Sequence, residues 1–159
     1  MVTRIIAVGK LKESYLTEAA QEYIKRLGPY TRLEMIQIPD EKCPEGAPES
    51  LIRQVKEKEG RKILDNLSDR EYVITLEIKG KRMTSEAFAG HLEELRTTGR
   101  PDITFVIGGS VGLSPEVSDR ADLKLSFSDM TFPHQLMRII LLEQIYRSFK
   151  IARHEPYHK

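Results

Sequence analysis

The stretch IGGSVGLSPEVSDRADLKLSFSDMTFPH, from Ile107 to His134, carries the features that decide the fold of this 159-residue chain. Its glycines follow an apolar run that ends at Ile107. A second apolar run, Leu123–Phe127, stops at a polar hinge just before a helix that Pro133 begins. Open α/β sheets bind ligands at the carboxyl ends of their strands, where both loops would lie. The stretch therefore predicts two backbone loops that together form a ligand pocket.

Apolar runs and helical patterns alternate along the whole chain. Runs rich in Val, Ile and Leu predict strands, and apolar residues spaced three and four apart predict helices. Strands are expected at residues 2–8, 33–38, 72–78, 103–107 and 123–127, and helices at 13–27, 51–67, 84–96 and 133–152, with a short helix opening at 114–115. A basic turn is expected at residues 79–82. The alternation predicts an α/β fold, with a mainly parallel sheet flanked by helices, in a single domain over residues 1–159.

The composition excludes several classes of protein. The 25 basic and 24 acidic residues give a net charge of +1, so the chain lacks the overall positive field of a strong nucleic-acid binder, although its last 26 residues are locally basic. No apolar run approaches the roughly 20 residues that cross a bilayer, and the first residues lack the long apolar segment of a signal peptide. One cysteine, Cys43, excludes an intramolecular disulfide. We expect a cytoplasmic protein without a membrane partner.

The glycines of the first loop allow two functional interpretations. Their spacing matches neither the dinucleotide fingerprint nor the P-loop, so a tight turn and a ligand loop both remain open. Residues 108–112 also match G-x-S-x-G, the nucleophile elbow of hydrolases, in which Ser110 would attack and His134 would serve as the base. An elbow needs a helix of normal length directly after the serine, and Pro115 follows too soon for one. A serine hydrolase is therefore the alternative rather than the main hypothesis.

No metal site is expected from the histidines. His154 and His158 would share a helix face, but Pro156 lies between them, and no cluster of cysteines or carboxylates accompanies them. The acidic, proline-rich segment 40–50 is predicted to be a surface loop, and its composition indicates no function.

The last predicted helix is apolar around most of its circumference. In a domain of this size the sheet covers one side of such a helix, so a second copy of the chain would cover another, which predicts a homodimer. Two polar residues, His134 and Arg138, are four apart and share a face of this helix. Arg138 could bind a phosphate or cap a structural element.

Four segments of the chain together resemble one known family. They are VITLEIKGK (Val73–Lys81), FVIGGSVGL (Phe105–Leu113), LSFSDMTFPHQLMRIILLEQIYRSFKI (Leu125–Ile151) and the closing PYHK. The combination resembles the RlmH family of SPOUT-class methyltransferases, which act on the large ribosomal subunit, and the match covers essentially the whole chain. The resemblance implies a SPOUT-type α/β knot with a C-terminal trefoil knot, a homodimer, and S-adenosyl-L-methionine as methyl donor without a metal. The implied substrate is N3 of a pseudouridine in 23S rRNA within the ribosome.

The resemblance also implies roles for particular residues. The residues expected to bind the cofactor are Leu76, Gly108, Phe127, Ser128, Asp129, Met130, Thr131 and Phe132. The residues expected to meet RNA are Arg138, Tyr157, His158 and Lys159. Removal of the N3 proton calls for a base, for which His134 and His158 are the candidates, and Arg138 would stabilise the developing anion. Besides the hydrolase, a non-catalytic ribosome-binding module is a further alternative.

Overall fold

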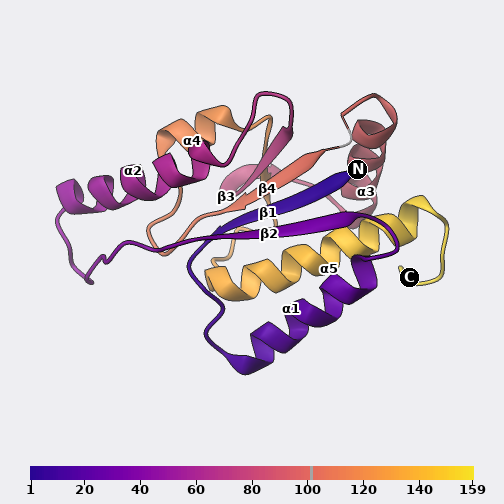
Figure 1. Ribbon diagram of the computed structural model, residues 1–159, viewed down its shortest axis with the longest axis horizontal. Helices are drawn as coiled ribbons and strands as arrows, with labels where there is room; N and C mark the ends of the chain where they lie inside the picture. Colours follow the sequence, from indigo (N-terminus) through magenta and orange to yellow (C-terminus); the bar gives the residue numbers. More distant parts are fainter. Residues whose placement is uncertain (101) are drawn as a thin grey trace.

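The computed structural model describes residues 1–100 and 102–159, which form a layered α/β fold (Figure 1). Its elements, in chain order, are β1 (Val2–Val8), α1 (Ser14–Leu27), β2 (Arg32–Ile38), α2 (Glu49–Asp65), β3 (Tyr72–Arg82), α3 (Ser85–Thr97), β4 (Ile103–Ile107), α4 (Pro115–Arg120), β5 (Leu123–Ser126) and α5 (His134–Ala152). The predicted strands and helices are confirmed, and most of their bounds shift by one or two residues. The trefoil knot stays a prediction.

Five strands form one sheet in the order β2-β1-β4-β3-β5, and every described pair is parallel. Residues of β1 pair on both sides, so that Ile5 lies beside Met35 of β2 and Phe105 of β4. All five residues of β4 are buried, as its apolar sequence predicts for the middle of a parallel sheet. The carboxyl ends of β4, β3 and β5 therefore lie next to one another at one edge of the sheet.

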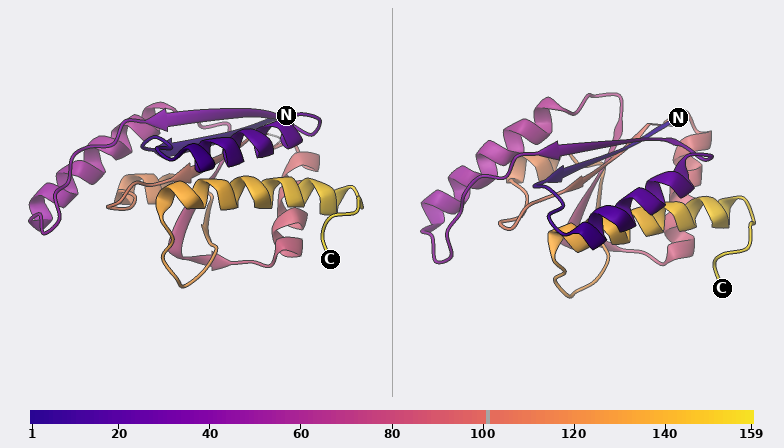
Figure 2. Two further views of the ribbon diagram at one scale, coloured as in Figure 1. Left: turned by 90° about the horizontal axis from the view of Figure 1, so that it is seen from below. Right: turned by 60° about the horizontal axis from the view of Figure 1, so that its bottom comes forward.

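The side chains of β1 alternate between two apolar cores, one on each face of the sheet. Ile5 and Ala7 join the larger core, which α1, α3 and α5 cover. Ile6 and Val8 join the smaller core, which α2 and α4 cover. Figures 1 and 2 show the helices in these two layers. Because helices cover both faces of the sheet, the strands have continuous apolar sequences rather than alternating apolar and polar residues.

Helix α5 is covered by more than the sheet. Its buried residues include Leu141, Leu142 and Ile145, which face the larger core, and α1 and α3 pack along its two flanks. We expected the sheet alone to cover this helix within one chain. That expectation is wrong, because α1 and α3 also cover it, and their distance from α5 in the sequence hid this contact. Apolar side chains remain accessible at its first turn, where Leu136 is 39% exposed.

The third strand continues through the predicted basic turn. Residues 79–82 belong to β3, and the strand meets β5 twice, since Leu125 pairs with Leu76 and again with Lys81. The prediction of a turn is wrong because backbone pairing across a bulge leaves no apolar pattern in the sequence.

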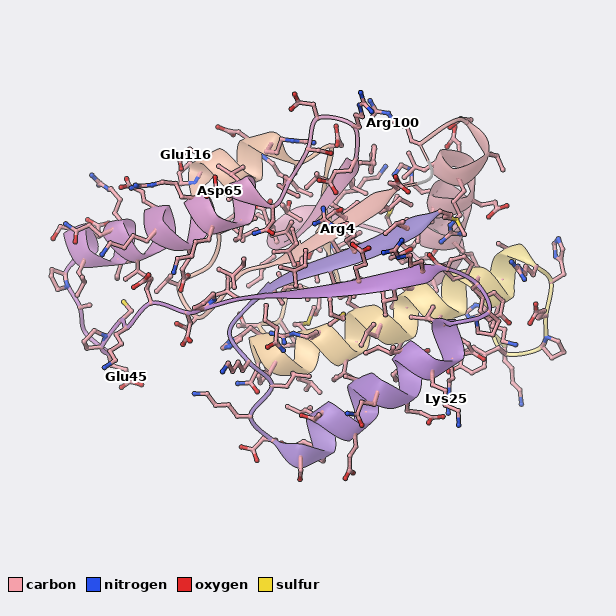
Figure 3. All side chains as sticks on the ribbon, in the orientation of Figure 1. Arg4, Lys25, Glu45, Asp65, Arg100 and Glu116 are labelled. Atoms are coloured by element: carbon pink, nitrogen blue, oxygen red, sulfur yellow. The ribbon has the colours of Figure 1, made fainter. Side chains whose placement is uncertain are left out.

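Charged side chains such as Lys25 and Glu116 project from the outer surfaces of the helices (Figure 3). Within residues 1–100 and 102–159, no helix combines the length and apolar character that a membrane span requires.

Candidate functional site

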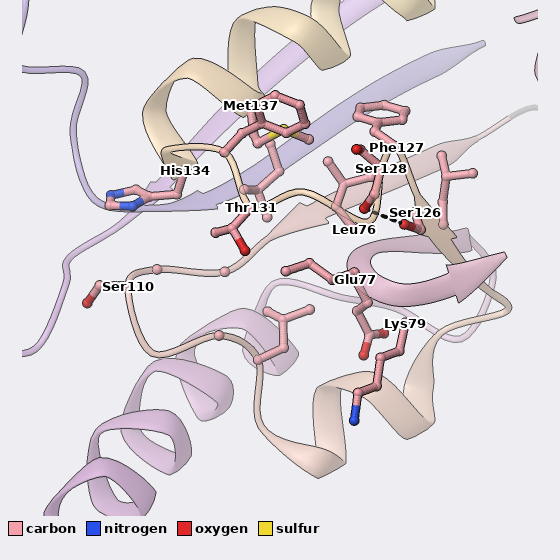
Figure 4. Close-up of a pocket in the computed structure, with 18 of the residues that line it drawn as sticks. Leu76, Glu77, Lys79, Ser110, Ser126, Phe127, Ser128, Thr131, His134 and Met137 are labelled. Atoms are coloured by element: carbon pink, nitrogen blue, oxygen red, sulfur yellow. Dashed lines mark hydrogen bonds between the residues drawn. The ribbon is translucent and has the colours of Figure 1, made fainter. Parts of the chain in front are cut away.

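A cavity of about 570 Å³ opens at the carboxyl edge of the sheet. Its walls come from the end of β3, the loop that follows β4, the hinge that follows β5, and the first turn of α5 (Figure 4). The lining residues are Lys56, Leu76, Glu77, Ile78, Lys79, Ile107, Gly108, Gly109, Ser110, Gly112, Leu113, Leu125, Ser126, Phe127, Ser128, Met130, Thr131, Phe132, His134 and Met137. The predicted pair of loops thus does enclose one pocket.

The bulge of β3 supplies one wall. The strand leaves β5 after Leu76 and returns to it at Lys81, so Glu77, Ile78 and Lys79 turn along the cavity. Gly80 makes the return possible, because a Cβ built there would lie 2.7 Å from the carbonyl carbon and oxygen of Lys124. A single missing side chain therefore shapes this wall.

The glycine loop supplies the second wall. A Cβ built on Gly108 would lie 3.0 Å from the side chain of Leu113, and Gly112 adopts a φ of +82° that strains other residues. The N–H of Gly112 donates to the carbonyl of Gly109 at 3.1 Å, which closes the turn. Because the glycines have no side chains, a ligand in the cavity can contact the main-chain atoms of the loop directly.

The hinge after β5 supplies the third wall and is held by its own serines. The hydroxyl of Ser126 donates to the carbonyl of Ser128 at 3.1 Å, and the hydroxyl of Ser128 accepts from the N–H of Met130 at 3.0 Å. The side chains of Met130 and Phe132 are 73% and 37% exposed. Large apolar side chains exposed around a concave surface are typical of a ligand site.

One predicted cofactor residue does not belong to the lining. The carboxylate of Asp129 accepts from Arg82 at 2.8 Å, and both side chains are more than two-thirds exposed at the surface. The Asp129 side chain is therefore engaged outside the cavity lining, and a role of this residue in cofactor binding stays a prediction. The other seven predicted residues line it: Leu76, Gly108, Phe127, Ser128, Met130, Thr131 and Phe132.

His134 lies at the end of the cavity that Ser110 also borders, away from Lys79 (Figure 4). Burial lowers the pKa of His134, and the charges of Arg138 and Lys12 lower it further, while Asp40 opposes them. A depressed pKa means that the imidazole is neutral near pH 7. His134 can therefore accept a proton from a group bound in the cavity.

Arg138 is fully buried one turn further along α5. Its Nη2 donates to the carbonyl of Gly9 at 3.2 Å, and its Nε and Nη1 have no partner among the described residues. A buried guanidinium has no surface with which to meet RNA, so the predicted RNA contact is corrected. Its charge acts on His134 instead.

The C-terminal tail turns back along α5 and is tied to the fold by contacts outside the cavity lining. Tyr157 donates its hydroxyl to Glu143 at 2.8 Å, while the ring nitrogens of His158 lie 3.0 Å from Arg147 and 2.6 Å from Glu86. These bonds hold the tail in place, although chain termini are often poorly ordered.

The candidate bases are consequently far apart within one chain. His158 lies against Arg147, which follows His134 by 13 residues of α5, a length of about 20 Å at 1.5 Å per residue. His134 and Arg138 are brought together by one turn of the helix, whereas His158 is not brought to either of them.

Sequence reasoning missed several charged residues of the cavity. Lys56 reaches it from α2, and Lys79 and Glu77 reach it from the bulge. Glu77 is engaged by the hydroxyls of Thr75 at 2.6 Å and Ser118 at 2.9 Å. The two lysines make no ion pair with a described carboxylate, so the rim presents positive charge. In the sequence, only the basic run at residues 79–82 could have indicated a positively charged rim.

The hydrolase alternative finds no support in this geometry. Helix α4 has only six residues, and no hydrogen bond between the Ser110 hydroxyl and a histidine occurs within the described part of the chain. The nucleophile, base and supporting helix of an elbow are therefore not assembled.

Comparison with known proteins gives consistent results. A family model described as "Predicted SPOUT methyltransferase" matches residues 1–158. Ribosomal RNA large subunit methyltransferase H 1 from Clostridium perfringens (strain SM101 / Type A) is 56% identical over 155 residues, which are 98% of each chain. Ribosomal RNA large subunit methyltransferase H from the strain ATCC 13124 of that species gives the same values.

A solved structure has a similar fold. It is a putative methyltransferase from Legionella pneumophila in complex with the bound cofactor SAM, which matches with a TM-score of 0.51 over 92% of this chain and 66% of that one. At 12% sequence identity the similarity shows the fold alone.

Proposed function

Since the chain belongs to the SPOUT methyltransferase family and, within it, to the RlmH family, we propose that it methylates N3 of a pseudouridine in 23S rRNA, with S-adenosyl-L-methionine as methyl donor. The observation that carries the proposal is the cavity between the glycine loop and the hinge. The ribosomal RNA substrate is suggested by the names of the chain's relatives. We place the reaction in the cytoplasm, in a single domain spanning residues 1–159.

The residues of the cavity fit the methyl donor. Apolar side chains of Leu76, Ile107, Met130 and Phe132 would hold the adenine, and main-chain groups of the glycine loop and the hinge would read its edges. A Cβ at Gly108 would fill part of this cradle. When bound, S-adenosyl-L-methionine supplies a methyl group already activated by its positive sulfur. The protein must then align the acceptor nitrogen and exclude water.

His134 is the residue that we propose as the base. Its lowered pKa leaves it neutral near pH 7, so it can take the N3 proton of pseudouridine as the methyl acceptor becomes nucleophilic. Arg138 acts through His134 rather than on RNA, because the buried guanidinium opposes the imidazolium and so keeps the base free. Arg138 also fixes the turn at Gly9, next to which His134 lies.

We propose that the tail contributes to the site of a second copy of the chain in a homodimer. Tyr157 and His158 are held against Glu143, Arg147 and Glu86 and do not line the cavity of their own chain, so they would meet the same nucleotide as His134 from another protomer. Two α5 helices packed antiparallel about a two-fold axis would place each tail beside its partner's cavity. The accessible apolar side chains at the start of α5, including Leu136, are available for such packing.

Mixing two inactive variants tests this arrangement. A dimer of one His134→Ala chain and one His158→Ala chain contains one site with both histidines intact, provided that the tail acts across the interface. Random exchange of subunits should then restore activity at about a quarter of the sites. Each variant dimer alone should stay inactive. Absence of recovery, with exchange verified by mass spectrometry of tagged chains, would contradict action in trans.

The charge of the protein favours an assembled ribosome over free RNA. With a net charge of +1, the chain releases few counterions on binding and so grips naked RNA weakly. A preformed ribosomal surface that both protomers meet supplies the missing affinity. We therefore expect activity on ribosomes and little on a short RNA hairpin.

The test of the function uses a labelled methyl group. Ribosomes from cells that lack this enzyme, isolated large subunits and deproteinised 23S rRNA are each incubated with the protein and tritiated donor. After nuclease digestion, mass spectrometry should identify 3-methylpseudouridine from 23S rRNA in the ribosomal samples. Label in another nucleoside, or in ribosomal protein, would refute the proposed substrate.

A further inference from the structure

Glu59 is a buried carboxyl group outside the lining of the cavity. It lies on the inner side of α2 and is 4% exposed. Its Oε2 accepts the backbone N–H of Glu41 at 2.9 Å, and its Oε1 has no partner among the described residues. Burying a carboxyl group with one unpartnered oxygen is costly, so its retention in this position calls for an explanation.

The unpartnered oxygen lies against the glycine loop. A Cβ built on Gly109 would lie 3.5 Å from Oε1 of Glu59 and 3.0 Å from Cγ1 of Val8. Gly109 lines the cavity. Glu59 and Val8 therefore set how far this part of the loop can move away from the cavity.

The other carboxyl oxygen holds the start of the segment between β2 and α2. The carboxylate of Glu41 also pairs with Lys62 of α2 at 3.1 Å, which gives the segment a second tie. Its neighbour Asp40 lies close enough to His134 to raise the pKa of that residue. The beginning of this segment therefore borders the side of the site where His134 lies.

The charges that face Glu59 come from Asp40, Glu41 and Lys62. Burial raises the pKa of Glu59, the two carboxylates raise it further, and the hydrogen bond from Glu41 and the charge of Lys62 oppose them. A neutral carboxyl group still accepts the Glu41 N–H, and it avoids leaving a bare charge against Gly109.

We propose that Glu59 is a positioning residue of the methyl-donor site, which ties the glycine loop and the segment that begins at Asp40 to α2. The inference rests on the proposed function of the cavity. It assigns a role to the start of the acidic segment 40–50, whose composition indicates none. The physical effect is pre-organisation, because loops held in the binding conformation need not be ordered when the ligand binds.

Two substitutions of Glu59 distinguish the effect of its hydrogen-bond acceptor from the effect of its negative charge. Glu59→Gln keeps the shape and an acceptor for the Glu41 N–H, whereas Glu59→Met keeps the length but removes the acceptor. The exposed neighbour Glu57 receives the same two changes as matched controls. Calorimetric titration with S-adenosyl-L-methionine should give a dissociation constant raised roughly tenfold or more for Glu59→Met and within about twofold of wild type for Glu59→Gln.

Amide hydrogen exchange supplies a readout that needs no ligand. In Glu59→Met, exchange should accelerate in residues 40–48 and 108–113 together, and it should be unchanged in Glu59→Gln and in both Glu57 variants. Equal binding and exchange in Glu59→Met and wild type would overturn the inference, as would a Glu59→Gln variant impaired as severely as Glu59→Met. A wild-type protein that binds no S-adenosyl-L-methionine would contradict the proposed function, while the exchange data would still decide whether Glu59 ties the two loops.

Discussion

Replacement of Gly80 by alanine tests how the bulge of β3 forms a wall of the cavity. The added Cβ would lie 2.7 Å from the carbonyl carbon and oxygen of Lys124 and 2.9 Å from the carbonyl carbon of Leu125. All three are backbone atoms, so rotation of a side chain cannot relieve the contact. The two strands must separate by several tenths of an ångström, at the point where Leu125 pairs with both Leu76 and Lys81.

The expected cost follows from this geometry. Overpacking in a well-packed interior costs about 1–3 kcal/mol, and a clash with backbone belongs in the upper part of that range. A loss of about 2–3 kcal/mol lowers the melting temperature of a chain of this size by roughly 4–12 °C. Separation of the strands also displaces residues 77–79, so the affinity for S-adenosyl-L-methionine should fall together with the stability.

Gly90→Ala is the matched control. Gly90 lies in α3, and a Cβ built there meets no heavy atom within 4 Å. Alanine in an exposed helix interior is favoured over glycine by about 0.8–1.0 kcal/mol, so this variant should melt slightly above wild type. Differential scanning calorimetry at one fixed protein concentration compares the three proteins, since dimerisation would make melting depend on concentration. A Gly80→Ala protein that melts and binds like wild type would refute the assigned role of the bulge.

Two further predictions concern the chemistry and the substrate. Because burial and a neighbouring cationic side chain lower the pKa of His134, the single-turnover methylation rate should be constant above pH 7 and fall only under more acidic conditions. Asp40→Asn removes a charge that favours the imidazolium, so the acidic limb should move to lower pH, and a shift to higher pH would contradict the assignment. Exchange of Lys56 and Lys79 for glutamine should raise the KM for ribosomes. The slope of log affinity against log salt should fall by about one for each phosphate that a lysine no longer neutralises. An unchanged slope would exclude the two lysines from the RNA surface.

The sequence was sufficient to predict the elements and the edge of the sheet at which the site lies. Apolar periodicity is a local property, so the strands and helices follow from it with small errors at their ends. The loop after Ile107 and the hinge after Ser126 both follow parallel strands, and they therefore meet at one edge. The resemblance to a known family added the choice of ligand, which the spacing of Gly108, Gly109 and Gly112 left open.

The remaining features depend on contacts between distant segments. Lys56 lies far before Leu76 in the chain and has no local sequence signal for a place in the cavity. Arg138 would be expected at a surface or an ion pair, because arginine is almost never fully buried alone. Tyr157 and His158 are held by residues of α5 and α3, which the sequence of the tail itself could not identify.

The central claim is that the cavity binds S-adenosyl-L-methionine, and calorimetric titration of the wild-type protein and of Leu76→Arg tests it most directly. Wild type should bind the ligand saturably at one site per chain. In Leu76→Arg, a charged side chain replaces part of the apolar wall of the cavity and also repels the positive charge of the methyl donor, so affinity should fall by roughly 100-fold or more while the protein remains folded. No binding by wild type, or equal binding by both proteins, would contradict the account.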